Sequence, residues 1–353
     1  MSKEMRENTP FEQLASSELS RLLFNIPLKV TQGNRFQPTG FPNLGAATYV
    51  INGKMSVIVE SHQSMTNRLE GQVMDEEGRP IELLSRMSYV RVMRDRRLMT
   101  TSLREPHRLN SPHLLNAAYG AERFEETLKN TLDANWLSWL FKHDVNTLIH
   151  GVFFSQVKDK HDKRLARLLS AYIEAHNATA VLSGGVKTET VTGTGVTAED
   201  GGGMIPFTRE EFVAEKIMLY VSLDLAHLRS YRLTEPQRRL LLALALYKVR
   251  RFISEPQRLR TACDLVAESD EVGAEGSGLL LPSLQELEDV LKGADFSDMV
   301  QLELIAAAPK PQDAQKGKGK GKGKGKGKGK NDVSADESEE DEEADPPQSA
   351  SAD

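Results

Sequence analysis

The chain has 353 residues, which suffice for one large domain or two small ones, and its formal net charge is −6. Cys263 is its only cysteine, so an intramolecular disulfide and a cysteine-based zinc site are excluded. The N-terminus has no apolar signal core, and the apolar run from Leu240 to Tyr247 is too short to span a bilayer. These features predict a cytoplasmic protein without a membrane partner.

The first elements follow from capping and β-branching. The segment Thr9-Pro-Phe-Glu12 is a capping box with proline at the first helical position, and Leu22 and Leu23 are expected to continue the apolar face of that helix. A strand is predicted over residues 26–30, and the Gly-, Pro- and Asn-rich residues 32–44 predict a loop.

Residues 55–70 predict a strand that leads directly into a helix. The β-branched run from Val57 to Val59 favours a buried strand, and Ser64 is expected to cap the helix. The free backbone N–H groups of a helix start suit a phosphate or sugar, and an ordinary junction with a surface arginine is the alternative. The polar side chains at this point are Gln63, Ser64, Asn67 and Arg68.

The middle of the chain predicts further short elements. Strands are expected at residues 89–93 and, as a central strand that is apolar on both faces, at residues 147–154. Ser111 should cap a helix running toward Tyr119, and residues 121–141 read as helical. The aromatic residues of this last segment, Trp136, Trp139 and Phe141, fit core packing better than base stacking, and His150 fits a hydrogen-bonded core histidine.

The C-terminal half predicts an amphipathic helix over residues 165–175 and a flexible loop or hairpin tip over residues 184–203. A half-buried strand follows at residues 217–225, because apolar residues alternate with polar ones. A capping box at residues 234–237 opens a further helix. The last elements are a helix from Ser283 to Gly293 and a strand over residues 299–305.

The order of these elements predicts an α+β protein over residues 1–308. Residues 309–353 should form a disordered tail, because eight lysines alternate with seven glycines over 316–330 and ten acids without a base fill 332–353.

Basic residues are concentrated in two places despite the negative net charge. Residues 86–108 hold seven arginines, and residues 229–260 hold nine lysines or arginines. Such local density is typical of a nucleic-acid groove. The second cluster includes Arg250, Arg251, Arg258 and Arg260.

A metal-dependent nuclease is the alternative from another class. The dipeptides His143-Asp144 and His161-Asp162 occur in metal-dependent phosphohydrolases, but such sites need further ligands that converge on the metal. The second dipeptide lies in a charge-dense segment typical of a solvated surface. No cofactor, no metal and no catalysis are therefore expected.

The segment Glu60-Ser-His-Gln-Ser-Met-Thr-Asn-Arg-Leu-Glu70 resembles a signature of the backbone subunit of type I-G (formerly I-U) CRISPR effector complexes, a member of the RAMP superfamily. Six further blocks resemble the same family in the same order, and together the blocks span roughly residues 20–305. They are Arg108-Leu-Asn-Ser-Pro112, His150-Gly-Val-Phe-Phe154, Gly184-Gly-Val-Lys187, Ile205-Pro-Phe-Thr-Arg-Glu-Glu-Phe212, Leu223-Asp-Leu-Ala226 and Leu259-Arg-Thr-Ala-Cys-Asp-Leu265.

The resemblance implies an RRM-like, ferredoxin-type antiparallel sheet with large helical and loop insertions. It implies a non-catalytic subunit that polymerises head to tail along a CRISPR RNA and presents the guide for pairing with target DNA. Its further implied partners are a large subunit and a guide-processing subunit, and a general single-stranded RNA-binding protein is the alternative. Within the matching blocks, Gln63, Ser64, Asn67, Arg68, Arg108, Lys187 and Arg209 are the expected RNA contacts, together with the second basic cluster.

Overall fold

The computed structural model describes residues 9–41, 45–132, 135–160, 163–188 and 204–307. The expected disordered tail, the dipeptide at residues 161–162 and most of the expected loop at residues 184–203 lie outside these ranges. In the described part, no helix is both long and apolar enough to cross a membrane.

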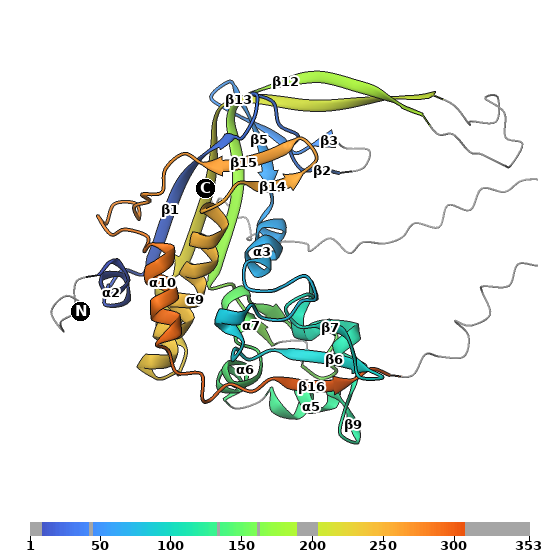
Figure 1. Cartoon of the computed structure of the whole chain (residues 1–353), viewed down its shortest axis with the longest axis vertical. Coiled ribbons are helices and arrows are strands. Elements are labelled where there is room, and N and C mark those ends of the chain that lie inside the picture. Colours follow the sequence, from blue (N-terminus) through green and yellow to red (C-terminus); the bar gives the residue numbers. More distant parts are fainter. Residues whose placement is uncertain (1–8, 42–44, 133–134, 161–162, 189–203, 308–353) are drawn as a thin grey trace, which may run out of the picture. The chain divides into compact units, whose positions relative to one another are not determined.

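Groups of strands and groups of helices follow one another along the chain (Figure 1). The helices are α2 Pro10–Ala15, α3 His62–Gly71, α4 Pro112–Leu115, α5 Phe124–Thr131, α6 Trp136–His143, α7 Val145–His150, α8 Leu225–Ser230, α9 Glu235–Ile253 and α10 Leu284–Lys292, with 3-10 turns η1 Glu82–Leu84 and η2 Arg108–Asn110. The strands are β1 Arg21–Val30, β2 Gly40–Phe41, β3 Gly45–Ala46, β4 Thr48–Ile51, β5 Lys54–Glu60, β6 Val90–Arg94, β7 Arg97–Thr101, β8 Ala118–Tyr119, β9 Glu122–Arg123, β10 Val152–Phe153, β11 Arg164–Leu165, β12 Leu169–Thr188, β13 Met204–Asp224, β14 Gln257–Arg260, β15 Cys263–Ala267 and β16 Leu302–Ile305.

The main sheet has a ferredoxin-type core. Its strand order is β14-β15-β1-β13-β12-β5-β4, and every pair of neighbours is antiparallel. Chain order through the core is β1, α3, β12, β13, α9, β15, so strand 4 of the motif lies beside strand 1, and strand 3 separates strands 1 and 2. This topology confirms the α+β class and the RRM-like architecture expected from the sequence.

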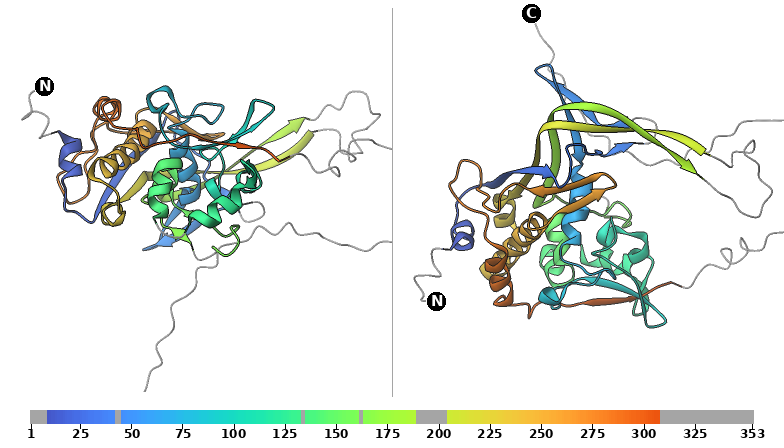
Figure 2. Two further views of the ribbon diagram at one scale, coloured as in Figure 1. Left: turned by 90° about the horizontal axis from the view of Figure 1, so that it is seen from below. Right: turned by 45° about the horizontal axis from the view of Figure 1, so that its top comes forward.

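One face of the main sheet carries the core. Along β12 the residues Ala171, Ile173 and Ala175 are buried, and they alternate with half-buried polar and aromatic residues. Helix α9 supplies a nearly continuous set of buried leucines and alanines, and α3 packs beside both β12 and α9 (Figure 2). Alternation with period two is what a sheet with one packed face requires.

A second sheet lies in the part of the chain between α3 and β12, together with the last strand. Its order is β7-β6-β16-β8-β9, and β16 runs parallel to β6 although the two strands are distant in sequence. Helices α5, α6 and α7 belong to the same stretch of chain. These elements are the large insertion that the family resemblance implied.

Elements with local start signals agree with the sequence predictions. Thr9 caps α2, the capping box at residues 234–237 opens α9, and Ser283 caps α10, which ends at Gly293. The predicted strands at residues 89–93 and 217–225 are confirmed by β6 and β13, apart from Tyr89, which precedes β6, and Leu225, which begins α8. At each of the three helix starts, a capping side chain within a few residues of the boundary decides where the helix begins.

The predicted central strand at residues 147–154 is wrong. Residues Val145–His150 form helix α7, whose N-cap Asp144 accepts a hydrogen bond from the Thr147 N–H at 3.4 Å, and only Val152–Phe153 are extended. All six residues of α7 are buried. A short segment that is buried on every side has no period that separates helix from strand.

The predicted helix at residues 165–175 is also wrong, because these residues belong to β11, the connection that follows it and the start of β12. Ile173 lies opposite Leu219 of β13 and Glu60 of β5, so pairing on both sides fixes the extended conformation. Tertiary pairing outweighed the apparent helical spacing.

Several boundaries differ from the predictions. Leu22 and Leu23 lie in β1, because α2 ends at Ala15. The helix that Ser111 caps stops at Leu115, and the predicted helix at residues 121–141 is divided into α5 and α6.

Candidate nucleic-acid interface around helix α3

Helix α3 begins directly where β5 ends. Ser61, rather than the predicted Ser64, is the N-cap, and its hydroxyl accepts a hydrogen bond from the Ser64 N–H at 3.2 Å. Ser64 therefore lies inside the first turn, and the free N–H groups of the helix start belong to its first residues. The partial positive charge of such a terminus favours an anion.

Exposed polar side chains surround this helix start. Gln63 and Asn67 are exposed, and the Gln63 Nε2 donates to Asn67 Oδ1 at 3.3 Å. The Arg167 guanidinium, from the connection between β11 and β12, donates to Gln63 Oε1 at 2.6 Å. The structure thus joins two predicted residues with a cation that the sequence did not single out.

Two arginines share one buried carboxylate next to this surface. Glu60, the last residue of β5, is fully buried, and Arg68 donates to its Oε1 from Nε at 3.1 Å and from Nη2 at 2.8 Å. Arg260 of β14 donates to the same oxygen and to the Gln37 carbonyl at 3.1 Å. The Arg68 and Arg260 side chains are 27% and 23% exposed, so the cluster presents an excess positive charge to solvent.

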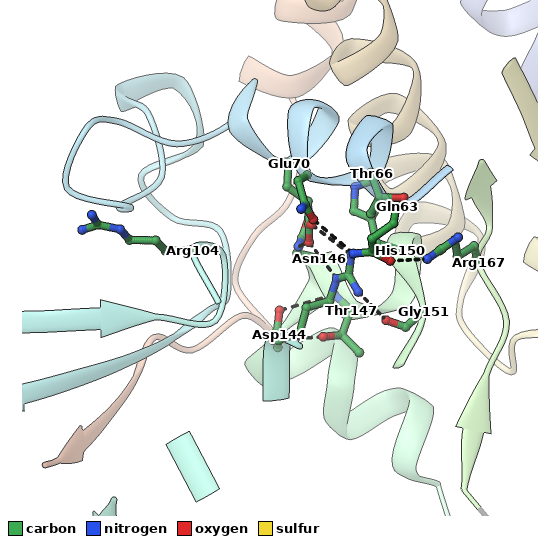
Figure 3. A network of polar contacts seen from close by, with 12 residues as sticks. Gln63, Thr66, Glu70, Arg104, Asp144, Asn146, Thr147, His150, Gly151 and Arg167 are labelled. Carbon is green, nitrogen blue, oxygen red and sulfur yellow. Dashed lines mark hydrogen bonds and ion pairs between the residues drawn. The ribbon is translucent and has the colours of Figure 1, made fainter. Parts of the chain in front are cut away.

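A buried polar network lies at the other end of α3 (Figure 3). Arg108 forms a bidentate ion pair with Glu70, at 2.7 Å from Nε to Oε1 and 2.9 Å from Nη2 to Oε2. Asn146 of α7 donates to Glu70 Oε1 at 2.6 Å, and Lys248 of α9 donates to the Asn146 side chain. Lys248 Nζ also lies 2.8 Å from His150 Nε2.

Arg108 occupies an unusual backbone conformation, with φ at +50°. Such strain persists only where the surroundings fix it, and the Glu70 pair does so together with the Gly151 carbonyl, which accepts from Arg108 Nη1 at 3.3 Å. Gly151 itself has φ at +74°, and a Cβ there would lie 2.5 Å from the Leu165 carbonyl oxygen. Only glycine permits that close approach.

Burial shifts the pKa values of the network. Desolvation lowers the pKa of Lys248 to about 7, against the opposing attraction of Glu70. Desolvation also raises the pKa of Asp144 to about 6 and lowers the pKa of His150 well below its ordinary value. His150 is therefore neutral at pH 7, and its Nδ1 is buried without a hydrogen-bond partner among the described residues.

The other predicted arginine contacts differ in their exposure to solvent. Arg250 is buried, and it donates to the carbonyls of Leu281, Pro282 and Asp270 at 2.6–2.7 Å, so the described bonds of its guanidinium are internal, like those of Arg108. Arg251 and Arg258 are exposed.

Lys187 and Arg209 lie on the two strands of the long β12–β13 hairpin. Lys187 is paired with Ile205, and Arg209 is paired with Ser183. The side chains of both residues lie outside the described part of the structure. Their contact with RNA stays a prediction.

The first candidate nuclease dipeptide, His143-Asp144, has structural partners. His143 stacks on Trp139 with ring centroids 4.5 Å apart, and Asp144 caps α7. Within the described residues, no group of three or more His, Cys, Asp and Glu side chains could hold a metal. Burial raises the pKa of the Cys263 thiol to about 11, so the thiol is protonated at neutral pH.

Arg167 is the site residue that the sequence did not indicate. The preceding segment was interpreted as a solvated surface and residues 165–175 as a helix, so Arg167 had no predicted neighbour. The pairing of β12 with β5 places it beside the start of α3. The sequence feature that could have indicated Arg167 was its position in a segment, residues 165–175, that could also form a strand.

Part of the chain is similar to a known protein family. Residues 22–180 match the family model described as "CRISPR-associated protein GSU0053". This match agrees, over that segment, with the CRISPR-associated family expected from the sequence, and the RAMP superfamily and the type I-G subtype stay predictions. No curated protein is significantly similar to the chain in sequence.

Solved structures with a similar chain include two titled "CRISPR RNA-guided surveillance complex", one of them in a pre-nicking state. The pre-nicking chain is 10% identical with a TM-score of 0.36, over 74% of this chain and 76% of that one. The other is 13% identical with a TM-score of 0.34, over 74% and 66%. Csc2 from Thermofilum pendens is 12% identical with a TM-score of 0.29, over 79% of each chain. At these TM-scores the similarity carries no argument about function.

Proposed function

We propose that this chain, matched over residues 22–180 by a CRISPR-associated family, is a non-catalytic backbone subunit that binds the guide RNA of a type I-G surveillance complex. Copies of the chain assemble head to tail along the RNA and leave the guide bases free to pair with target DNA. A large subunit and a guide-processing subunit complete the complex. Such a head-to-tail contact does not close on itself, so the guide and the capping subunits set the copy number.

The observation that supports this proposal best is the pair of arginines on Glu60. One carboxylate balances only one of the two guanidinium groups, and both groups remain partly exposed. Gln63 lies in the first turn of α3, and Arg167, from the connection between β11 and β12, donates to it. Arginine, amide and backbone N–H groups are the usual partners of phosphate oxygens, and they do not read base identity.

Arg108 and Arg250 have a different place in this proposal. Their guanidinium groups are buried and hydrogen-bonded to Glu70 or to backbone carbonyls. We therefore assign them to the support of the surface and not to direct phosphate contact. The phosphate contacts are assigned to Gln63, Ser64, Asn67, Arg68, Arg167, Lys187, Arg209, Arg251, Arg258 and Arg260.

The test is to express the chain with the other subunits of its complex and to sequence the RNA that co-purifies. RNAs of uniform length with repeat-derived ends support the proposal. RNAs of mixed length and origin favour a general single-stranded RNA-binding protein. Metal-dependent cleavage of a labelled RNA by the purified chain favours the nuclease.

A further inference from the structure

A row of aromatic rings lies on the face of the main sheet opposite to the core. Tyr172 of β12 and Tyr220 of β13 stack with centroids 5.1 Å apart and an interplanar angle of 27°. The His62 ring packs against Tyr172 with centroids 4.6 Å apart and an interplanar angle of 55°, and His176 meets Tyr220 edge-on at 6.0 Å. We call His62, Tyr172, Tyr220 and His176 the aromatic ladder.

The strand register places the tyrosines and His176 on one face. Tyr172 is paired with Tyr220, which is paired in turn with Asn25 of β1, and His176 is paired with Ser56 of β5. Directly paired residues point to the same side of a sheet. The face that carries the ladder is therefore the one that the buried residues Ala171, Ile173 and Ala175 leave free.

This face is partly open to solvent, although Met218 and Ser56 on the same face are buried. Tyr172, Tyr220 and His176 are half-buried, and Asn25 beside them is exposed. On the same strand, Leu23 is 43% exposed. Tyr172, Tyr220 and His176 are thus partly accessible to solvent although their rings contact one another.

The charges beside the aromatic ladder are positive near His62 and negative near the tyrosines. At one end, His62 is the first residue of α3, where Arg167 and the helix start favour a phosphate. Near the tyrosines lies Glu174, two residues from Tyr172 on the same face of β12; burial and then the Glu174 charge raise the pKa of both ladder tyrosines. A carboxylate repels phosphate, whereas it accepts hydrogen bonds from the amino and ring N–H groups of a nucleobase.

From these observations we infer that the aromatic ladder is a stacking site for unpaired RNA bases, next to the phosphate contacts of α3. The RNA backbone passes Arg167 and the start of α3, and a base turns onto Tyr172 and Tyr220. The inference rests on the proposed function, because it assigns a position to the bases of the same RNA. Stacking is tolerant of sequence, since every base has a π-face.

The experiment separates base contacts from phosphate contacts. Full-length protein freed of RNA is titrated with a short single-stranded RNA and with an abasic strand of the same length, which keeps ribose and phosphate only. We expect the wild-type protein to bind the base-bearing strand tighter by on the order of tenfold for each stacked base. The variant Tyr172→Leu/Tyr220→Leu should lose this preference but retain its affinity for the abasic strand.

Two control variants test whether the loss of preference is specific to the aromatic rings of the ladder. Tyr119→Leu removes a tyrosine that is 43% exposed on β8, and it should keep the full preference. Tyr172→Phe/Tyr220→Phe keeps the rings and should also retain it. Equal preference in the leucine variant and the wild-type protein would overturn the inference.

The wild-type protein alone distinguishes the remaining outcomes. Equal binding of both strands overturns the stacking site and leaves the phosphate surface intact, whereas binding of neither contradicts the proposed function itself. Should the leucine variant not fold, a 4-thiouracil-labelled RNA is crosslinked to the wild-type protein and the peptides are identified by mass spectrometry. Crosslinks to Tyr172 or Tyr220 support the site, and crosslinks confined to other strands overturn it.

Discussion

Arg108 and Glu70 form a bidentate ion pair in the protein interior, with both side chains almost fully buried. The pair connects α3 to the 3-10 turn η2, and Asn146 extends it to α7. One contact thus joins the helix that carries the proposed RNA surface to the inserted region. The position of α3 depends on a charge pair that has no access to bulk water.

Glu70→Ala should lower the free energy of unfolding by about 3–5 kcal/mol, because it leaves Arg108 buried without its counter-charge. Urea unfolding followed by circular dichroism measures the change. Glu77→Ala is the matched control, since its pair with Arg79 is exposed and surface pairs contribute up to about 1 kcal/mol. Similar losses in the two variants would mean that the buried pair does not hold the structure.

Lys248 should make stability depend on pH. Its pKa is about 7 in the folded protein against an ordinary value of 10.5, so between these values the unfolded chain binds more protons. The free energy of unfolding then rises with pH from about 7 upward, by up to about 1.4 kcal/mol per pH unit. Below pH 7 both states are protonated and this contribution to the slope disappears.

Lys248→Met should remove that part of the slope, because groups common to both proteins cancel in the comparison. Urea unfolding at pH 7, 8 and 9 provides the measurement, and Lys142→Met removes an exposed lysine as the control. A slope in Lys248→Met that equals the wild-type slope would show that the amine is not desolvated.

Arg68→Ala and Arg167→Ala should each weaken RNA binding to the same extent for unrelated guide sequences, because phosphate contacts carry no base identity. The slope of log affinity against log salt should decrease in magnitude by about 0.7 per lost contact on a single strand. Fluorescence anisotropy across a salt series measures both effects.

Arg123→Ala is the control for this series, because Arg123 is exposed on β9 and pairs with Glu125. Arg68→Ala leaves Glu60 paired with Arg260, so the variant should fold. A loss confined to one guide sequence would indicate base reading. Unfolding of Arg68→Ala would assign the arginine a structural role.

Removing residues 332–353 should tighten non-specific binding of DNA and RNA at low salt. The ten acids of this segment lie next to eight lysines in sequence, and opposite charges at that spacing partly mask one another. Filter binding of the full-length and 1–331 proteins measures the gain, which should fade as salt rises. Identical curves would leave the acidic segment as a solubilising appendage.

Cutting after Ala308 should leave the melting temperature nearly unchanged, because the composition of residues 309–353 opposes any core. Differential scanning calorimetry of both proteins is the measurement. A decrease of several degrees would show that the tail packs on the rest of the chain.

The sequence by itself determined the elements whose starts are encoded locally. Thr9, Ser283 and the capping box at residues 234–237 begin helices because each cap bonds to backbone within the same turn. The alternation in residues 217–225 likewise specifies a strand with one buried face. The family resemblance added the topology that these local signals could not provide.

Only the tertiary structure decided which charged residues face the solvent. Arg68 and Arg108 look equivalent in the sequence, yet Arg68 stays partly exposed while it pairs with the buried Glu60, and Arg108 lies buried against Glu70. It also decided that residues 145–150 are helical and residues 169–188 extended. A short apolar segment can form either a helix or a strand, and the elements that pack against it or pair with it decide between them. Both outcomes depend on contacts between residues far apart in the chain, and such contacts leave no periodic signal in the sequence.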